Sequence, residues 1–380
     1  MEGNKTVAFL DLEGTFLVEH PILAAIIVFI FLIMISLTLV GNVLVCLAIL
    51  LVRKLNQQPA NLLLVSLACA DLGVALCVMP PALLLLLKQR WVLGSTACRF
   101  WTSADLTLCT ASILNLCMIC IDRYRAVCNP LVYTMERTTK QILCYIAIVW
   151  IGALFVSIAP LTLLELKHVE EDTCQVPQNV FYQIYATVIA FYAPTCIMVF
   201  LYMQMWKEAQ RICKQDRHTQ GTHTVPKTEE FSAKKSLRKF HRPSALLTVV
   251  KVQLLSTHSS FKGENKARKT LGVIMSVFIC CWLPFFILAL VKTLFEIPQW
   301  LDFLALWLGY SNSMLNPLIY CKYNREFRIP FREMLCCRFS TLQTVMRHES
   351  FTNKFGPTRQ QTPLIGEATP THKLTQTSQM

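Results

Sequence analysis

Residues 21–52, PILAAIIVFIFLIMISLTLVGNVLVCLAILLV, contain no charged side chain, and this stretch decides the class of fold. A helix needs about 20 consecutive, mostly apolar residues to cross the hydrocarbon layer of a bilayer. This stretch exceeds that length. It therefore predicts a membrane-spanning helix.

Six further apolar stretches follow along the chain. They cover residues 58–87, 97–121, 142–164, 180–206, 270–291 and 303–321. The first of these contains one acid, Asp71, and the second contains Arg99 near its start and then Asp105. Taken alone, the stretch with Asp105 could be a core helix of a soluble protein, but six neighbouring spans argue against that. The sequence thus predicts an all-α membrane protein, a seven-transmembrane helix bundle.

Polar segments around these stretches complete the predicted organisation. We expect an N-terminal tail (1–20), a seven-transmembrane domain (21–322) with a long loop (about 207–265), a short amphipathic eighth helix (323–338) and a disordered tail (339–380). The loop and the tail are rich in polar residues, as is typical of unfolded segments. No internal repeat is visible, which argues against a transporter made of duplicated halves.

Composition supports lipid as the solvent. Hydrophobic residues make up 54% of the chain, charged residues only 16%, and the mean hydropathy is +0.46. A soluble protein could not cover so much apolar surface. The net charge of +13 is concentrated in a few polar segments. We therefore expect contact with anionic lipid and no nucleic-acid partner.

Basic residues predict the orientation in the membrane. They cluster after the first, third and fifth spans, at Arg53, Lys54, Arg123, Arg125, Arg137, Lys140, Lys234, Lys235, Arg238, Lys239 and Arg242. The positive-inside rule places these connections in the cytoplasm, the N-terminus outside and the C-terminus inside. The acidic N-terminal tail lacks the basic region of a cleaved signal, so the first span is expected to direct insertion. Asn4, in the sequon Asn4-Lys5-Thr6, then becomes a glycosylation candidate.

Cysteines outside the apolar runs suggest two modifications. Cys98 and Cys174 fall in polar connections on the predicted outer side, where a disulfide is the natural state. Cys336 and Cys337 follow an amphipathic stretch, which favours palmitoylation, with free cysteines as the alternative.

Ionisable groups inside a membrane are costly and therefore mark functional candidates. Asp71, Asp105 and the triplet Asp122-Arg123-Tyr124 lie within or at the end of predicted spans. The structural alternative for each is a carboxylate paired with a neighbouring helix.

The set of motifs resembles the rhodopsin-like G-protein-coupled receptors over roughly residues 21–338. The resemblance rests on Gly41-Asn42, the run around Asp71, Asp122-Arg123-Tyr124, Trp150, Cys281-Trp282-Leu283-Pro284 and Asn316-Pro317-Leu318-Ile319-Tyr320. Asp105 lies seven residues after Cys98, where biogenic-amine receptors carry their amine-binding carboxylate. Membership of this family implies a receptor that is not an enzyme.

The resemblance implies a ligand site built around Asp105, whose carboxylate would pair with a protonated amine. Tyr310 would orient that carboxylate. Trp282, Phe285 and Phe286 would stack on a flat ring. The further members of the implied site are Cys109, Ala186, Thr187, Ala190 and Trp307.

The nature of the amine follows from the fifth span and from local sequence. Thr187 is the one hydroxyl among the three matching positions, the other two being alanines, which argues against a catechol. An unpaired buried ligand hydroxyl costs about 1–3 kcal/mol. The runs 78–81, 90–93 and 111–117 look like serotonin receptors of type 6, whereas the short tail looks more like invertebrate octopamine and tyramine receptors. Serotonin is the predicted ligand, with octopamine or tyramine as the alternative.

The resemblance also implies a signalling apparatus. Asp71, Ser112, Asn312, Ser313 and Asn316 match a cluster that holds a sodium ion, the alternative being a protonated Asp71. Asp122, Arg123, Tyr124, Tyr202, Glu264 and Tyr320 match residues that control contact with a heterotrimeric G protein, here expected to be the stimulatory one that raises cyclic AMP. Arrestin and receptor kinases are expected as further partners.

Two rival functions deserve comparison. A receptor of the same fold for a neutral lipid or peptide would use Asp105 only as a structural partner of Tyr310. A transporter or channel needs a continuous polar path, yet the fourth, fifth and sixth spans carry no charge.

Overall fold

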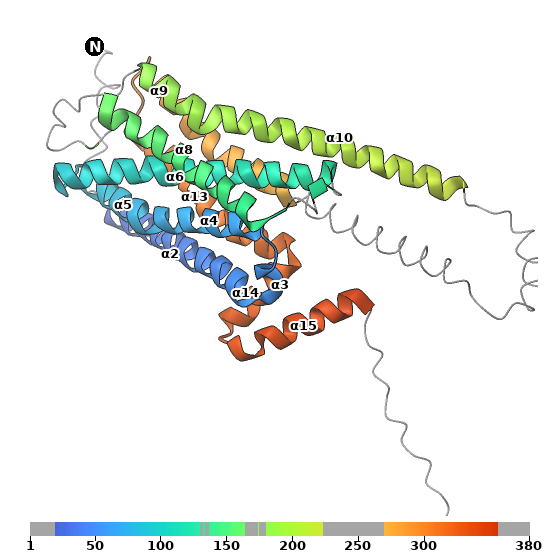
Figure 1. The fold of residues 1–380 in the computed structure, drawn as a ribbon. Helices are drawn as coiled ribbons and strands as arrows, with labels where there is room; N and C mark the ends of the chain where they lie inside the picture. Colours follow the sequence, from blue (N-terminus) through green and yellow to red (C-terminus); the bar gives the residue numbers. More distant parts are fainter. Residues whose placement is uncertain are drawn as a thin grey trace, which may run out of the picture.

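The structure is a computed structural model that describes residues 20–129, 132–133, 137–163, 174, 180–222 and 270–355. Within these ranges every regular element is a helix. Long helices lie side by side, roughly parallel to one axis (Figure 1). The predicted all-α helix bundle is confirmed.

Six helical segments of the described chain are long and apolar enough to cross a membrane. They comprise α2 (Pro21–Leu51); α4 (Asn61–Gly73) with η1 (Val74–Val78) and α5 (Met79–Lys88); α6 (Gly94–Cys128); α8 (Thr139–Leu163); α9 (Val180–Thr187) with η2 (Val188–Tyr192) and α10 (Ala193–Thr222); and Thr270–Val291. The seventh member of the bundle, α13 (Gln299–Tyr323), is less apolar because it carries the polar side chains Asn312, Ser313 and Asn316, which are buried inside the bundle.

Helix α6 occupies the centre of the bundle and contacts α4, α8 and α10, while α2 contacts α4 and α13 (Figure 1). Gly41 allows α2 and α13 to approach closely. A Cβ atom at this position would lie 2.9 Å from the ring of Pro317, closer than real Cβ atoms come to their neighbours. Trp150 ties α8 to α4, because its indole nitrogen donates a hydrogen bond to Ser66 Oγ at 3.1 Å.

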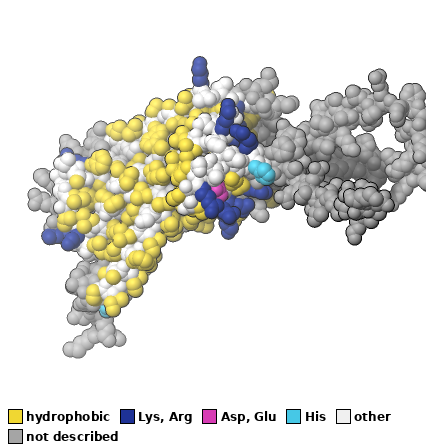
Figure 2. Space-filling model, turned by 90° about the horizontal axis from the view of Figure 1, so that it is seen from below, with side chains coloured by type: hydrophobic (Ala, Val, Ile, Leu, Met, Phe, Trp, Pro, Cys, Tyr) yellow, Lys and Arg dark blue, Asp and Glu magenta, His cyan; other side chains and the backbone are white. Residues whose placement is uncertain are grey.

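The outer face of the bundle is apolar. Large hydrophobic side chains such as Phe29, Ile151 and Phe155 are 64–67% exposed. Figure 2 shows a broad hydrophobic band with Lys and Arg side chains gathered mainly at one end. Such a band would be unfavourable in water but is expected of a surface that faces lipid.

The two ends of the bundle differ in chemistry. We call the end with Cys98 and Cys174 the disulfide end. The opposite end, with Arg53, Lys54 and Arg123, is the basic end.

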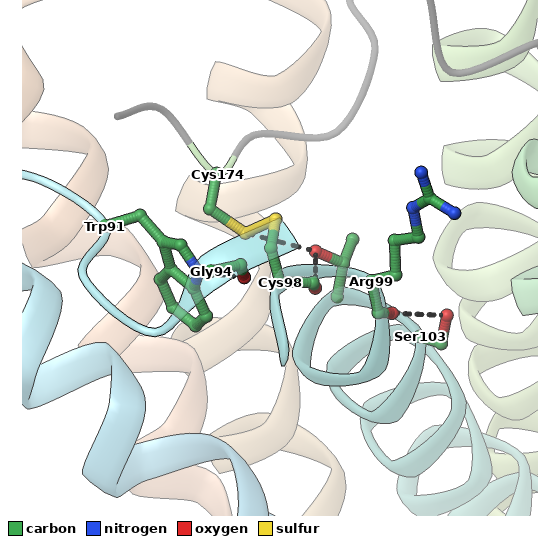
Figure 3. The surroundings of a disulfide bond; sticks show 7 residues. Trp91, Gly94, Cys98, Arg99, Ser103 and Cys174 are labelled. Carbon is green, nitrogen blue, oxygen red and sulfur yellow. Dashed lines mark hydrogen bonds between the residues drawn. A yellow bond between two sulfur atoms is a disulfide. The ribbon is translucent and has the colours of Figure 1, made fainter. Parts of the chain in front are cut away.

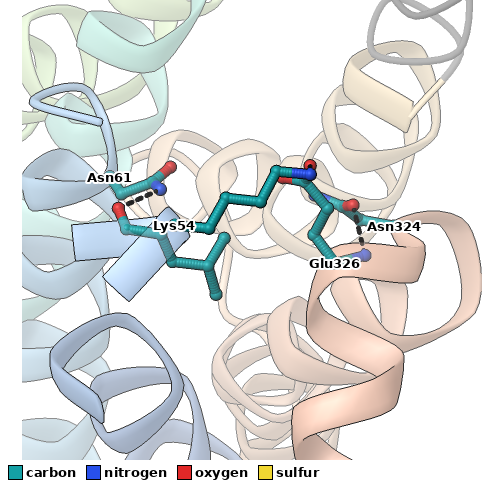
Figure 4. Close-up of polar contacts among 5 residues, drawn as sticks. Lys54, Asn61, Asn324 and Glu326 are labelled. Carbon is teal, nitrogen blue, oxygen red and sulfur yellow. Dashed lines mark hydrogen bonds and ion pairs between the residues drawn. The ribbon is translucent and has the colours of Figure 1, made fainter. Parts of the chain in front are cut away.

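An amphipathic helix follows the bundle, as predicted, although α14 (Arg325–Leu335) is slightly shorter than residues 323–338. Phe327, Phe331 and Met334 form its buried face. Asn324 caps its start by accepting a hydrogen bond from the backbone nitrogen of Glu326 at 3.1 Å. Figure 4 shows the Glu326 side chain meeting Lys54, with 2.8 Å between carboxylate and ammonium.

Two predicted boundaries were wrong. The disordered tail was expected to begin at residue 339, but Phe339–Phe355 form helix α15, which packs against α14. Leu342 and Met346, spaced one turn apart, are buried and give this polar segment the apolar stripe that a docked helix needs. The long loop was expected to begin at about residue 207, but α10 continues to Thr222, through a run rich in the strong helix formers Lys, Glu, Gln and Arg.

Candidate functional site

A cavity of about 290 Å³ opens inside the bundle, toward the disulfide end. Its walls come from α5, α6, α8, α9, η2, the helix Thr270–Val291 and α13, together with Cys174. Asp105, Cys109, Ala186, Thr187, Ala190, Trp282, Phe285 and Phe286 all line it. The structure therefore brings eight of the ten predicted ligand-binding residues to one cavity.

Asp105 projects from α6 into this cavity. Cys109, one helical turn further on, donates a hydrogen bond from Sγ to Asp105 Oδ1 at 3.2 Å. The fully buried Tyr310 approaches the same carboxylate, although its hydroxyl does not meet the geometry of a hydrogen bond here. No cationic side chain of the described residues forms an ion pair with Asp105. This carboxylate is thus available to a cationic ligand, which would offset the cost of placing a charge in an apolar site.

Aromatic rings form one wall of the cavity. The rings of Trp282 and Phe285 meet edge to face with centroids 5.9 Å apart. Phe286 stacks on Phe191, which belongs to η2, at 4.4 Å and 9°. Rings held at right angles and in parallel in this way offer a flat ligand both a face and an edge to pack against.

Thr187 is buried in the wall that α9 and η2 contribute, together with the small residues Ala186 and Ala190. Its hydroxyl donates to the backbone carbonyl of Gln183 at 2.7 Å. The donor of this hydroxyl is therefore occupied, and its oxygen is left to accept. A ligand hydroxyl at this wall could therefore donate to Thr187 Oγ1.

Tyr310 and Trp307 are the two predicted ligand-binding residues that do not line the cavity. Tyr310 lies behind Asp105. Trp307 is directed instead toward α2, where its ring stacks on Phe31 with centroids 3.8 Å apart. The stacking buries Trp307 to 3% exposure, so this indole holds two helices together. The structure does not bring Trp307 into contact with the cavity.

Residues that the sequence interpretation missed form the mouth of the cavity. They are Gln89, Tyr182, Lys292, Gln299, Asp302, Phe303 and Leu306. Helical spacing alone would not have found Lys292 and Asp302. Lys292 lies ten residues after Trp282 and Asp302 eight before Tyr310, and both intervals differ from whole numbers of turns by about a fifth of a turn.

The disulfide between Cys98 and Cys174 is present, with a Cα–Cα distance of 5.7 Å, which confirms the prediction. Figure 3 shows it at the start of α6, next to the turn in which the Trp91 indole donates to the carbonyl of Gly94 at 2.8 Å. The bond holds Cys174 against the cavity wall.

Asp71 is fully buried in the middle of the bundle. Its carboxylate accepts hydrogen bonds from Ser112 Oγ at 2.9 Å, Ser313 Oγ at 2.8 Å and Asn316 Nδ2 at 3.0 Å. Asn312 is buried beside them on α13. Among the described residues, neither atom of its side-chain amide has a hydrogen-bond partner, and Asn316 Oδ1 has none either. The structure therefore gathers the predicted polar cluster and leaves oxygen atoms in it unsatisfied.

Arg123 forms an ion pair with the neighbouring Asp122 at 2.9 Å at the basic end of α6. Tyr133 donates to both oxygens of Asp122, at 2.9 and 3.0 Å. Burial raises the pKa of Tyr133 to about 12. The phenol therefore stays protonated at neutral pH and remains a donor to the buried Asp122.

The remaining predicted residues have various placements. Tyr124 lies on α6 next to Arg123, Tyr202 packs against Gly272, and Tyr320 is buried with its ring 5.9 Å from Phe327. Cys336 and Cys337 are exposed in the turn between α14 and α15. Asn4 and Glu264 lie outside the described residues.

Comparison with known proteins defines the class. Residues 41–320 match the sequence model of the family described as 7 transmembrane receptor (rhodopsin family). The chain therefore belongs to the rhodopsin family of seven-transmembrane receptors, which is a family of receptors and not of enzymes. It is a multi-pass membrane protein.

Relatives within this family narrow the resemblance. The chain is 40% identical over 367 residues to 5-hydroxytryptamine receptor 1 of Drosophila melanogaster, covering 83% of this chain and 65% of that receptor. It is 37% identical to human 5-hydroxytryptamine receptor 1B, covering 78% and 83% of the two chains. It is also 33% identical to 5-hydroxytryptamine receptor 7 of Xenopus laevis, over 80% and 75%. The chain thus spans slightly less than two thirds of the Drosophila receptor's length.

Proposed function

We propose that this chain is a receptor for a biogenic amine, serotonin, and that ligand binding activates a heterotrimeric G protein. The observation that carries the proposal is the carboxylate of Asp105, held by Cys109 in a cavity with an aromatic wall and paired with no cation of the described residues. A protonated amine supplies the missing charge, and its ring packs against Trp282 and Phe286.

Two independent observations favour serotonin. The relatives described above are named as receptors for 5-hydroxytryptamine. The cavity also offers the oxygen of Thr187 to one ring hydroxyl, while Ala186 and Ala190 leave room for a bicyclic ring. Octopamine and tyramine, each with one phenol, are the alternative ligands that the same threonine would serve.

In the proposed arrangement the disulfide end faces the outside of the cell and the basic end faces the cytoplasm. The disulfide and the excess of Arg and Lys at opposite ends support this orientation. The N-terminus would then be extracellular, with Asn4 open to glycosylation, and the C-terminus cytoplasmic. Arg123 would release Asp122 to meet the G protein, and palmitoyl groups on Cys336 and Cys337 would anchor the turn after α14. Receptor kinases and arrestin would act on the cytoplasmic side.

We also propose that the Asp71 cluster binds a sodium ion. Carboxylate, hydroxyl and amide oxygens are the donors that hard cations prefer, and the cluster contains the unsatisfied oxygens of Asn312 and Asn316. A bound cation would neutralise Asp71 inside the bundle. The competing arrangement, a protonated Asp71, predicts that sodium has no effect on ligand affinity.

The test is a panel of amines applied to cells that express the chain. Serotonin, octopamine, tyramine, dopamine and histamine are compared by cyclic AMP and by a G-protein dissociation assay that reports every subtype. We expect serotonin to act at the lowest concentration and to raise cyclic AMP, as the resemblance to type 6 receptors implies. A fall in cyclic AMP would overturn the stimulatory coupling alone. A preference for octopamine or tyramine would overturn serotonin, and silence toward every amine despite surface expression would overturn the amine receptor itself.

A further inference from the structure

Two charged side chains meet at the mouth of the cavity. Lys292 lies just after the helix Thr270–Val291, and Asp302 lies in the first turn of α13. Their ammonium and carboxylate groups form an ion pair, and both side chains are largely buried, with 28% and 27% exposure. Both residues line the cavity.

The pair lies on the same two helix faces that form the ligand site. Trp282, Phe285, Ala289 and Lys292 follow one another at intervals of three, four and three residues, and all four line the cavity. With a rise of 1.5 Å per residue, Lys292 stands about 15 Å above Trp282 along the helix axis.

Helix α13 also presents residues to the cavity at intervals of one helical turn. Asp302 and Leu306 line the cavity at an interval of four residues, and Tyr310, which approaches Asp105, follows after four more. Asp302 therefore lies about 12 Å from the level of Tyr310 along α13. A ligand bound at Asp105 that is longer than a simple amine would extend along this face toward Asp302.

One of the two acidic residues that line the cavity forms an ion pair with a lysine, and the other does not. Asp105, Lys292 and Asp302 are the charged residues among the described residues that line it. Lys292 neutralises Asp302, so that Asp105 is the carboxylate that remains for a ligand. Burial lowers the pKa of Lys292, so its ammonium depends on Asp302 for stabilisation. Gln89 and Gln299, both uncharged, also line the cavity.

We propose that Lys292 and Asp302 are specificity-determining residues that restrict the cavity to ligands with a single positive charge. The proposal rests on the proposed function, in which Asp105 binds the amine. Lys292 occupies the position on Asp302 that a second ligand ammonium would take. A dicationic ligand would have to displace Lys292 and leave that ammonium unpaired in a largely buried place, which is unfavourable. A ligand with an uncharged polar end would instead leave the pair intact and meet Gln89 or Gln299.

The test compares two probes in the full-length chain in cell membranes. One probe is tryptamine with an aminoalkyl chain on its amine nitrogen, long enough to reach Asp302. The other carries a hydroxyl in place of the terminal ammonium. Their affinities are measured by displacement of tritiated serotonin, and the result is the ratio of the two dissociation constants for each variant.

Replacement of Lys292 by methionine keeps the length of the side chain and removes its charge. K292M is expected to shift the ratio by about two- to five-fold in favour of the dication, the amount expected of one partly exposed ion pair. D302N is expected to shift it by a similar factor toward the hydroxyl probe. The double variant K292D/D302K keeps an ion pair and is expected to retain the ratio of the unmodified chain, provided that surface labelling shows normal expression.

The control is Lys88, which is exposed at the same end of the bundle and does not line the cavity. K88M removes the same charge, so it isolates the general effect of surface potential. An unchanged ratio in K292M, or an equal shift in K88M, would overturn the proposal while serotonin binding stands. One outcome would refute only the proposal for Lys292 and Asp302. In that outcome tritiated serotonin binds, D105N abolishes its binding, and the ratio of the two dissociation constants in K292M equals that of the unmodified chain. Absence of serotonin binding to the unmodified chain would overturn both the proposed ligand and the proposed role of Lys292 and Asp302.

Discussion

Gly309 of α13 packs against the indole of Trp282, and its replacement by alanine is predicted to disturb the wall of the cavity. A Cβ atom at this position would lie 2.7 Å from Cζ3 and 2.8 Å from Cε3 of Trp282, both closer than any real Cβ contact. Trp282 is 3% exposed and cannot turn freely. The indole must therefore shift by several tenths of an ångström toward the cavity that it lines.

Overpacking of this kind costs about 1–3 kcal/mol. Alanine also improves helix propensity by about 1 kcal/mol, which offsets part of that cost. Thermal stability should therefore change little, whereas the ligand meets a displaced ring. We expect the affinity for serotonin to fall about ten-fold, which corresponds to about 1.4 kcal/mol.

The assay is saturation binding of tritiated serotonin to membranes that carry G309A. The matched control is G152A on α8, where the new Cβ would lie 3.3 Å from the end of the Leu114 side chain, which can move. Both variants gain the same helix propensity, so the difference between them isolates the clash with Trp282. In a W282F background, where the ring at this position is smaller, G309A should cause a smaller loss of affinity than it does in the unmodified chain. Equal affinities in G309A and G152A would refute the reasoning.

Three further predictions follow from other contacts. Tyr133→Phe removes the hydroxyl that donates to both oxygens of Asp122. We expect it to lower the free energy of unfolding by about 1 kcal/mol. We also expect higher basal G-protein activity, measured without ligand. Cys98→Ser opens a disulfide between residues 76 positions apart; the cost of about 4–5 kcal/mol should abolish serotonin binding and most surface expression, and normal binding would contradict this. Lys54→Met breaks the ion pair with Glu326, in which the two side chains are 43% and 35% exposed. We expect the melting temperature to change by less than about 2 °C, because an exposed pair contributes little, and a larger change would contradict this.

The apolar stretches predicted most of the fold, because length and lack of charge are sufficient to identify a spanning helix. The start of α2 at Pro21 and the helix Thr270–Val291 coincide with the predicted stretches. The third stretch, doubtful by hydropathy alone, is the central helix α6, which buries the polar side chains Thr110, Ser112 and Asn115 inside the bundle. Tertiary burial of polar groups cannot be read from a hydropathy average.

Polar segments were harder to assign. The sequence does not predict the extension of α10 to Thr222 or the helix α15, because low apolar content is also typical of disordered segments. In α15 the decisive signal was the pair Leu342 and Met346, one turn apart and buried. Helix propensity and short apolar stripes deserve as much weight as overall polarity in such segments.

The candidate site was predicted in its chemistry but not in its extent. Asp105 and the aromatic residues after Trp282 meet at one cavity because helical periodicity places them on inward faces. Trp307 matched the same pattern, yet its ring stacks on Phe31 of α2. The partner of a residue on a neighbouring helix depends on the rotation and spacing of two helices, which one sequence does not specify. For the same reason the pairing of Lys292 with Asp302 emerged only from the structure.

The most direct test of the central claim is the affinity of the Asp105→Asn receptor for serotonin. Asparagine keeps the shape of the side chain and removes the charge that the ligand ammonium would meet. Loss of one partner of a buried charge pair costs about 3–5 kcal/mol, which is roughly a few hundred- to several thousand-fold in affinity. We predict a loss of this size for D105N at normal surface expression, with E326Q as the control that removes an acid outside the cavity lining. Binding of serotonin to D105N within about ten-fold of the unmodified receptor would contradict the claim that Asp105 is the amine-binding carboxylate.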